Sequence, residues 1–198
     1  FGKIVMCLNP RHSSLLFLER IIFKRKHYRQ ITCISEQCKK EIVNHYKVSP
    51  HTIEIIYNGV NISIFTPKNR TTYRDTVRAT YGIAPDEVLL LFVGSGFKRK
   101  GLKYVIEALS LINKSQKTKL LVVGKGTIRE HQRLARKNGV LDKLIFAGVC
   151  KHIQEIYAGG DIFVFPSEYD AFGTACLEAM ASGLPVIASK SSGVSEIT

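Results

Sequence analysis

No apolar run in the sequence approaches the roughly 18 residues that a membrane-spanning helix requires. The sequence therefore predicts no transmembrane helix within these 198 residues. It also shows no signal peptide and no initiator Met, and it opens directly on the apolar stretch 4–8. We expect the chain to be a fragment of a longer cytoplasmic protein.

Cysteines are few, and their spacing suggests no pairing. There are five, an odd number, and none belongs to a C-x-x-C motif, which argues against a disulfide framework. We interpret them as reduced, buried residues of a cytoplasmic protein. A zinc site would need clustered ligands, and the six His do not cluster with the cysteines, so the sequence predicts no zinc site. The five cysteines are Cys7, Cys33, Cys38, Cys150 and Cys176.

Acidic residues are also scarce: 16 Asp and Glu stand against 29 Lys and Arg, which gives a formal net charge of +13. Such an excess favours a polyanionic partner, whether nucleic acid, anionic lipid or a phosphorylated substrate. The sequence has no RNP motif, no zinc finger and no aromatic–basic interleaving, so we expect no nucleic acid. The basic residues within 11–29 fit a peripheral contact with an anionic membrane surface.

Residues 1–65 predict the end of one domain. The predicted elements are a helix over 13–26, a strand over 31–34, a helix over 35–46 and a buried strand over 53–57. An Asn-Gly turn follows, and residues 65–70 are typical of an exposed linker. We therefore predict a second domain over 66–198.

Residues 66–198 alternate apolar strands with amphipathic helices. The predicted strands span 88–93, 120–123, 144–146, 162–165 and 184–188. The predicted helices span 72–81, 101–113, 127–138, 152–158 and 173–181. This alternation predicts an α/β fold, in which a Rossmann-like parallel sheet carries helices on both faces. The loops after the strands should form one ligand-binding rim.

The first candidate site is the loop Gly94-Ser95-Gly96-Phe97-Lys98-Arg99-Lys100-Gly101, which follows a predicted strand and opens a predicted helix. Glycines allow a close approach of backbone to ligand, and a helix start with three cations suits phosphate. The spacing matches neither a Walker loop nor G-x-G-x-x-G. A tight turn with a solvated basic helix start explains the same residues.

The second candidate site contains two carboxylates. Asp170 precedes a predicted helix, and Glu178 lies inside that helix among small and apolar residues, where a carboxylate is costly unless it is exposed or bonded. Thr174 and Glu178 are four residues apart and share one helix face. The carboxylates could flank a ligand at the helix start and accept hydrogen bonds from sugar hydroxyls. A favourable helix dipole for Asp170 and simple exposure of Glu178 explain the spacing equally well.

The spacing Asp170-x7-Glu178, followed by 179–187, resembles the E-x7-E signature of glycosyltransferase family 4, whose members have the two-Rossmann GT-B fold. Other segments resemble motifs of this family in the same order along the chain. They are Asn58-Gly59-Val60-Asn61 with Phe65 and Pro67, Val93-Gly94 with Lys100-Gly101, Val123-Gly124-Lys125-Gly126, Phe146-Ala147-Gly148 and Gly193-Val194-Ser195-Glu196. Residues 93–101 and 9–12 are most similar to lipopolysaccharide-core glucosyltransferases.

The resemblance implies transfer of a hexose, with glucose favoured, from a UDP-sugar to a glycan or lipid-linked glycan, with retention of configuration and without a metal. It implies a catalytic set in which Lys100 binds the donor diphosphate, Glu178 the ribose and Asp170 the sugar. Val149 would lie near the base. The donor-binding residues that it implies are Gly94, Ser95, Gly96, Arg99, Lys100, Val149, Phe172, Gly173, Thr174, Ala175 and Glu178.

Two positions depart from the family pattern. Ser95 stands where the family usually has Arg, and Asp170 is one methylene shorter than the usual Glu, which leaves the donor sugar open. Residues 1–65 resemble only the end of the family's acceptor-side domain, so we expect the isolated chain to transfer no sugar. The main alternative is a basic module that binds anionic membranes or nucleic acid without catalysis. A Rossmann oxidoreductase is disfavoured because Lys125, not an acidic residue, follows Gly124.

Three remaining expectations concern single side chains. Tyr157 is predicted to lie in the core and not to act as a stacking platform. The six His lie in polar stretches and are predicted to be exposed. The basic residues Arg129, Arg133, Arg136 and Lys137 are predicted to form the solvated face of a helix.

Overall fold

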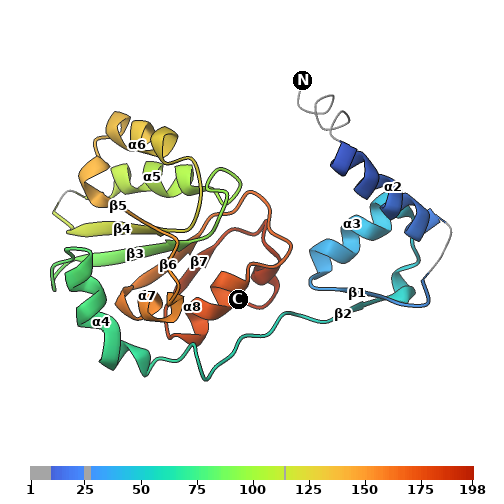
Figure 1. Cartoon of the computed structure of the whole chain (residues 1–198), viewed down its shortest axis with the longest axis horizontal. Coiled ribbons are helices and arrows are strands. Elements are labelled where there is room, and N and C mark those ends of the chain that lie inside the picture. The colour runs from blue at the N-terminus through green and yellow to red at the C-terminus, as the bar shows by residue number, and fades with distance from the viewer. Residues whose placement is uncertain (1–9, 25–27, 114) are drawn as a thin grey trace. The chain divides into compact units, whose positions relative to one another are not determined.

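The computed structural model describes residues 10–24, 28–113 and 115–198, and the chain divides into two compact units, Phe1–Tyr57 and Asn58–Thr198 (Figure 1). Among the helices that the structure describes, none combines the length and apolar character needed to cross a membrane.

Several sequence predictions fall outside the described residues. They include the cysteine at position 7, the motif residue Asn9 and the basic residues 25–27. The side chains of 10–12 and Lys24 are not described either, so the proposed membrane contact through 11–29 stays a prediction.

The first unit is a small two-stranded parallel sheet with helices. Its elements are α2 (Pro10–Lys24), β1 (Ile31–Cys33), α3 (Glu36–Tyr46), the 3-10 turn η1 (Pro50–Thr52) and β2 (Ile53–Ile55). Ser35 begins α3 by accepting a hydrogen bond from the Cys38 N–H at 3.1 Å. The strand predicted over 53–57 is shorter than expected, because only Ile53 is buried and the chain leaves the sheet after Ile55.

The second unit is built on a five-stranded sheet whose strands are all parallel, as the sequence predicts. Its strands are β3 (Val88–Val93), β4 (Thr118–Val123), β5 (Leu144–Gly148), β6 (Ile162–Phe165) and β7 (Val186–Ala188). Their order across the sheet is β5-β4-β3-β6-β7. The chain therefore builds outward from β3 in one direction and then crosses back to β3 to add β6 and β7 on the other side.

Helices cover both faces of this sheet, as predicted (Figure 1). The elements are α4 (Asn69–Thr80), α5 (Leu102–Leu111), α6 (Ile128–Lys137), η2 (Leu141–Lys143), α7 (Ile153–Gly159), α8 (Thr174–Ala181) and η3 (Gly193–Glu196). On one face, α5 and α6 pack against alternate residues such as Phe92 and Val122. On the other face, α4, α7 and α8 pack against Leu91, Phe163 and Phe165.

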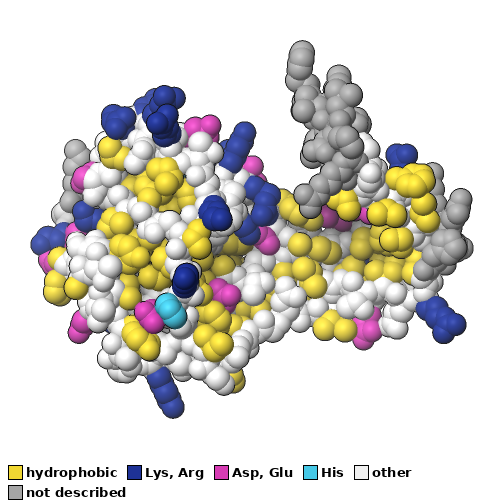
Figure 2. Space-filling view, in the orientation of Figure 1, with side chains coloured by type: hydrophobic (Ala, Val, Ile, Leu, Met, Phe, Trp, Pro, Cys, Tyr) yellow, Lys and Arg dark blue, Asp and Glu magenta, His cyan; other side chains and the backbone are white. Residues whose placement is uncertain are grey.

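Helix α6 presents a basic face, and Figure 2 shows Lys and Arg side chains gathered over it. Its opposite face is packed against the core, where Ala135 is fully buried. The expectation that every His is exposed is wrong for His131, which lies on this inner face, 5% exposed. Its Nδ1 lies 2.8 Å from the Thr127 carbonyl oxygen, and its ring meets Phe97 edge-on.

Residues 65–70 do not form the exposed linker that the sequence predicts. Phe65 is half-buried against the core, with its ring centroid 5.8 Å from that of Tyr157. Helix α4 already begins at Asn69, and Arg70 donates to the Gly160 carbonyl oxygen at 2.9 Å. Pro67 and Lys68 are exposed, as the polar composition suggests, but Phe65 and Arg70 have partners far along the chain. In the structure these residues belong to the second compact unit.

Three arginines of α4 converge on one carboxylate at the turn after α7. Arg70, Arg74 and Arg78 place guanidinium nitrogens 3.1, 2.7 and 3.0 Å from the carboxylate oxygens of Asp161. The Leu89 N–H, at the start of β3, donates to the same carboxylate at 2.9 Å. This junction joins α4, α7 and the central strand, so it fixes a helix layer against the sheet.

The environment of Asp161 favours its ionised form. Burial acts to raise the pKa of this carboxyl, but the Leu89 N–H and the arginine partners outweigh it and hold the pKa below its usual range. Arg78 is 4% exposed and also donates to the Ala84 and Glu87 carbonyl oxygens, both at 2.6 Å. Loss of the carboxylate would leave a buried guanidinium without its counter-ion.

We predict that Asp161→Asn lowers the free energy of unfolding by about 2–3 kcal/mol at pH 7. A carboxylate whose pKa is depressed in the folded state stabilises the protein fully above its pKa in the unfolded state. This contribution to the free energy of unfolding disappears as pH falls through the pKa in the folded state. The difference between the parent and the variant should therefore shrink below about pH 4, as measured by denaturant unfolding between pH 3 and 7.

Asp86→Asn is the matched control, because Asp86 pairs with Lys117 at 2.6 Å but both side chains are largely exposed. This variant should unfold like the parent. An Asp161→Asn variant that is as stable as Asp86→Asn at pH 7 would show that the arginine cluster does not hold the fold.

Candidate active site

The order of the strands defines one crevice at the carboxyl edge of the large sheet. The chain runs outward from β3 through β4 and returns to place β6 on the opposite side of β3. In open parallel sheets, ligands bind outside the carboxyl ends of the strands at such a reversal of strand order. Here the two loops at the reversal are 94–101, after β3, and 166–173, after β6. They contain the Lys100 and Asp170 predicted from the sequence.

The two loops are joined by backbone and side-chain hydrogen bonds. The Glu168 N–H donates to the Arg99 carbonyl oxygen at 2.9 Å, and Arg99 Nη1 donates to the Tyr169 carbonyl oxygen at 3.0 Å. Gly101 caps α5 with φ 74°, and a Cβ there would lie 1.8 Å from the Pro166 carbonyl oxygen. Only glycine allows this close approach, so the loops form one continuous wall.

Lys100 and Asp170 form an ion pair across these loops. The Lys100 ammonium bonds to Asp170 Oδ2, and Arg99 Nη1 lies 3.6 Å from the same oxygen. The Lys100 and Asp170 side chains are only 14% and 12% exposed, whereas the Arg99 side chain is 55% exposed. The Lys100 ammonium also lies 4.7 Å from the centroid of the Phe165 ring. The structure thus brings together two residues that the sequence analysis proposes separately for phosphate and sugar.

Serine hydroxyls support the loop that carries Asp170. Ser189 and Ser191 both donate to the Ser167 carbonyl oxygen at 2.6 Å, and Ser192 donates to the Phe172 carbonyl oxygen at 3.0 Å. Asp170 itself is joined to residue 192 by an isolated parallel bridge. The segment after β7 therefore holds the backbone of the loop that carries Asp170. Sequence analysis missed this scaffold, because serines in loops give no pairing signal.

Helix α8 begins directly beside Asp170. Gly173 has φ 95° at the cap, and a Cβ there would meet Ser192 Oγ at 2.9 Å. The Phe172 N–H donates to Asp170 Oδ1 at 3.3 Å, so this predicted ligand contact is already occupied within the protein. The first-turn N–H groups that follow, from Thr174 and Ala175, have no acceptor within their own helix. Thr174 is exposed, and its Oγ1 accepts a hydrogen bond from Asn58 Nδ2 at 3.3 Å.

Glu178 is half-buried on α8 and bonds to a core tyrosine. Tyr157 is fully buried, as predicted, and its hydroxyl lies 2.8 Å from Glu178 Oε2 and 3.2 Å from the Ala175 carbonyl oxygen. Burial raises the pKa of Glu178, and the Tyr157 hydrogen bond opposes this only in part. Burial and the nearby Glu178 also raise the pKa of Tyr157 well above its usual value. The phenol is therefore the proton donor in this contact.

Cys176 lies under the same site, fully buried on α8. Burial and, to a lesser extent, nearby Asp170 raise its pKa to about 12, and Lys100 opposes this in part. It lies within the electrostatic reach of both members of the ion pair.

Other predicted site residues lie on the rim without joining this group. Among the described residues, neither a hydrogen bond nor an ion pair links Glu178 to Lys100 or Asp170. Val149 follows β5 and is 61% exposed. Gly94, Ser95 and Gly96 form the turn after β3, where Ser95 Oγ accepts from the Lys125 N–H at 3.4 Å.

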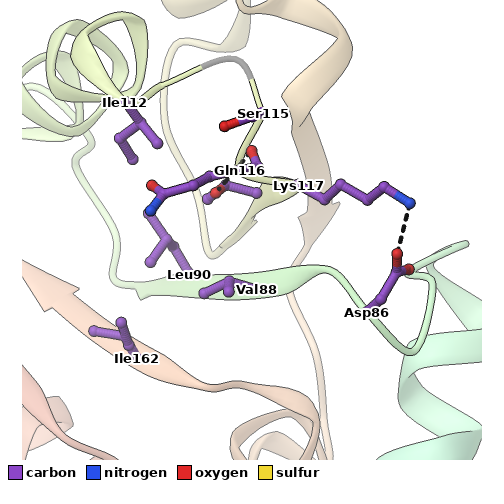
Figure 3. Close-up of a pocket in the computed structure, with 9 residues that line it drawn as sticks. Asp86, Val88, Leu90, Ile112, Ser115, Gln116, Lys117 and Ile162 are labelled. Carbon is purple, nitrogen blue, oxygen red and sulfur yellow. Dashed lines mark hydrogen bonds and ion pairs between the residues drawn. The ribbon is translucent and has the colours of Figure 1, made fainter.

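Two pockets frame the sheet. One of about 590 Å³ lies at the amino edge, far from the predicted rim, between Val88, Leu90, Ile112 and Ile162, with the Lys117–Asp86 pair beside it (Figure 3). The other, of about 420 Å³, lies at the carboxyl rim. It is lined by Gly96, Phe97, Lys98, Arg99, Gly126, Thr127, Glu168 and Tyr169.

Sequence analysis also missed the role of Glu168 in this rim. Its Oε1 accepts from the Tyr104 hydroxyl at 3.0 Å and pairs with Lys103 at 2.7 Å. These contacts tie the loop after β6 to the first turn of α5. Within the described residues, no group of three or more His, Cys, Asp or Glu side chains could hold a metal ion.

Comparison with known proteins places this chain in a family. Residues 73–198 match the family described as glycosyl transferases group 1, and residues 6–64 match glycosyltransferase family 4. The chain is 30% identical over 182 residues to the lipopolysaccharide glucosyltransferase WaaG of Escherichia coli, covering 91% of this chain and 49% of WaaG. It is 32% identical over 171 residues to an uncharacterised glycosyltransferase of Methanocaldococcus jannaschii, covering 85% and 44%. The chain thus spans about half the length of the curated relatives it matches.

Solved structures agree with the sequence comparison. A crystal structure of WaaG matches with a TM-score of 0.86 and 28% identity, covering 98% of this chain and 53% of that one. Anabaena HepE in complex with UDP matches with a TM-score of 0.80 and 21% identity, covering 98% and 54%, and so supports the fold alone. These matches favour a GT-B glycosyltransferase and do not favour a module that only binds membranes or nucleic acid. The chain belongs to the glycosyl transferases group 1 family and has the α/β fold of its GT-B members.

Proposed function

We propose that this chain is the donor-binding half of a retaining GT-B glycosyltransferase that transfers glucose from UDP-glucose to a glycan or lipid-linked glycan. The observation that carries the proposal is the group formed by Lys100, Asp170 and the start of α8 where the strand order reverses. The choice of glucose follows the similarity to the glucosyltransferase WaaG. The choice of UDP is supported by HepE, which has the same fold and is known in complex with UDP and glucose.

In this proposal Lys100 binds the donor diphosphate. The ammonium is held at the mouth of the crevice by Asp170, with the exposed Arg99 beside it. A diphosphate would join this cluster and share Lys100 with Asp170. The unpaired N–H groups and positive dipole of α8 add to the attraction. Fixed cations and N–H groups stabilise the charge that develops as the diphosphate departs, so the proposal includes no metal.

Asp170 then serves the sugar. Its carboxylate is fixed by Lys100 and by the Phe172 N–H, and its backbone is held from the segment after β7. A carboxylate held in this way can accept hydrogen bonds from sugar hydroxyls with little further ordering. The shorter side chain of Asp, compared with Glu, fits the rigid position that the ion pair gives it.

Glu178 would bind the ribose hydroxyls. Tyr157 bonds to Oε2, whereas no described residue bonds to Oε1. The raised pKa of Glu178 indicates that its ionised form is costly in the free protein. A ligand that donates hydrogen bonds to Oε1 would relieve this cost, which explains why a carboxylate lies among small apolar residues.

The remaining elements of the function are proposed for the whole protein. The whole protein would bind a glycan or lipid-linked glycan acceptor and would retain the anomeric configuration of the donor sugar. The basic residues within 11–29 would place the protein at an anionic membrane surface on the cytoplasmic side.

We predict that Lys100→Ala weakens UDP binding roughly ten- to a hundredfold, because a charged hydrogen bond contributes about 1.5–3 kcal/mol. Calorimetry or NMR titration measures the effect. Lys117→Ala is the control, because it removes the same charge at the opposite edge of the sheet. Equal affinities for UDP in both variants would contradict the assignment of Lys100.

We predict that Asp170→Asn binds UDP at least as tightly as the parent, because it no longer competes for the Lys100 ammonium. The glucose moiety should give UDP-glucose a higher affinity than UDP in the parent. In Asp170→Asn this advantage should fall roughly tenfold. Titration with both nucleotides measures this difference. Glu168→Gln is the control, because Glu168 is a neighbouring carboxylate that pairs with Lys103. This variant should keep the parent's preference for UDP-glucose over UDP. Weaker UDP binding in Asp170→Asn would show that Asp170 contacts the nucleotide and not the sugar.

We predict that Glu178→Gln makes the free protein more stable than the parent at pH 7 while it weakens UDP binding. A carboxyl whose pKa is raised in the folded state, as for Glu178, stabilises the protein below its pKa in the unfolded state. This contribution to the free energy of unfolding is lost as pH rises through the pKa in the folded state. The two proteins should therefore have similar melting temperatures near pH 4 and diverge as pH rises. Glu107→Gln, which changes an exposed residue of α5, should show no such divergence. If the parent is more stable than Glu178→Gln at pH 7, the ionised Glu178 carboxylate does not destabilise the free protein.

A further inference from the structure

The hydroxyl of Tyr157 is an uncommon group in an otherwise apolar core. The residue is fully buried on α7 and packs among Leu91, Phe163 and other members of the main core cluster. A phenylalanine would fill this position with the same ring and would need no hydrogen-bond partner. The hydroxyl points out of the core to Glu178, the carboxylate that the proposed function assigns to the donor's ribose.

The contact with Glu178 is directional. The Tyr157 hydroxyl lies 2.8 Å from Oε2 and 3.2 Å from the Ala175 carbonyl oxygen, both on α8. A phenol has one proton, and the ionised carboxylate is the stronger and nearer acceptor. Glu178 is therefore held by one oxygen, and a three-bond side chain that would otherwise rotate is fixed on the face of α8.

The tyrosine ring is itself held from two sides. The Phe163 ring lies 5.8 Å from it on the sheet side, and Phe65 meets it edge-on at 5.8 Å. Phe65 belongs to the segment 58–67, which follows α8 along its length. Asn58 of this segment bonds to Thr174 at one end of the helix, and at the other end a Cβ added to Gly183 would lie 3.3 Å from Pro67. The ring therefore has little freedom to move its hydroxyl away from Glu178.

We propose that Tyr157 is a positioning residue: its hydroxyl holds Glu178 Oε2 so that Oε1 is presented to the ribose hydroxyls of the donor, and Phe65 braces its ring. The inference rests on the proposed function, which supplies the ribose contact. It assigns a role in ligand recognition to a residue that never touches the ligand. It also connects the segment 58–67 to the donor site through Phe65.

The experiment compares UDP with 2′-deoxy-UDP, because the two differ only in a ribose hydroxyl. The 198-residue parent should prefer UDP by roughly tenfold. Tyr157→Phe should lose most of this preference. Tyr81→Phe is the matched control: it deletes a hydroxyl at the same core cluster, where Tyr81 contacts the Cys150 sulfur at 3.7 Å. This control should keep the parent's preference.

A double-mutant cycle separates positioning from a general loss of structure. If Tyr157 acts through Glu178, then Tyr157→Phe should weaken UDP binding in the parent and have no effect in a Glu178→Ala background, which has no side-chain acceptor for the hydroxyl. An equal loss in both backgrounds, or an undiminished preference for UDP in Tyr157→Phe, would overturn the proposal. Phe65→Leu, which keeps the hydroxyl, is the second variant. It should lower the preference in part, and an unchanged preference would remove Phe65 from the proposal.

The outcomes also separate this inference from the proposed function. A parent that binds UDP and 2′-deoxy-UDP equally would refute the ribose assignment of Glu178 and, with it, the role of Tyr157. A parent that prefers UDP, together with a Tyr157→Phe variant that prefers it equally, would refute only the positioning role.

Discussion

The reversal of strand order beside β3 is the constraint on which the site depends. Because β4 and β6 lie on opposite sides of one central strand, the loops after β3 and β6 must leave the sheet next to each other. Their close approach at Gly101 and Pro166 then places a cation of one loop against a carboxylate of the other. The site therefore depends on the order of the strands, which brings the two loops together so that their side chains can pair. Neither loop alone contains both Lys100 and Asp170.

Much of the fold could be predicted from the sequence, because its signals are local. Apolar strands that alternate with amphipathic helices predict the parallel sheet and its two helical layers, and the structure confirms both. The order of the strands could not be predicted, since the sequence gives their order along the chain and not across the sheet. The pairing of Lys100 with Asp170 follows from that order, so it too was not predictable.

Side-chain environments were harder to predict where the partner is distant. Residues 65–70 have the polar composition of an exposed linker, yet Arg70 bonds to Asp161 and Phe65 packs on Tyr157. The burial of Tyr157 was predicted correctly, but its contact with Glu178 was not, because the two residues lie on different helices. The donor roles of Lys100, Asp170 and Glu178 stay predictions, because they rest on family resemblance and on geometry without a ligand.

The buried thiol of Cys176 has a consequence for the chemical durability of the site. Thiolates, and not thiols, react with peroxides and alkylating agents. With a pKa of about 12 and no exposure to solvent, this sulfur stays protonated and shielded beneath the Lys100–Asp170 pair. Oxidation would place an acidic, bulkier group under a balanced pair of charges, and the fold makes that reaction slow. The prediction that the cysteines are buried is wrong for Cys38 and Cys150, which are partly exposed. Reagents that modify thiols should therefore label these two residues and leave the charge balance of the donor site unchanged.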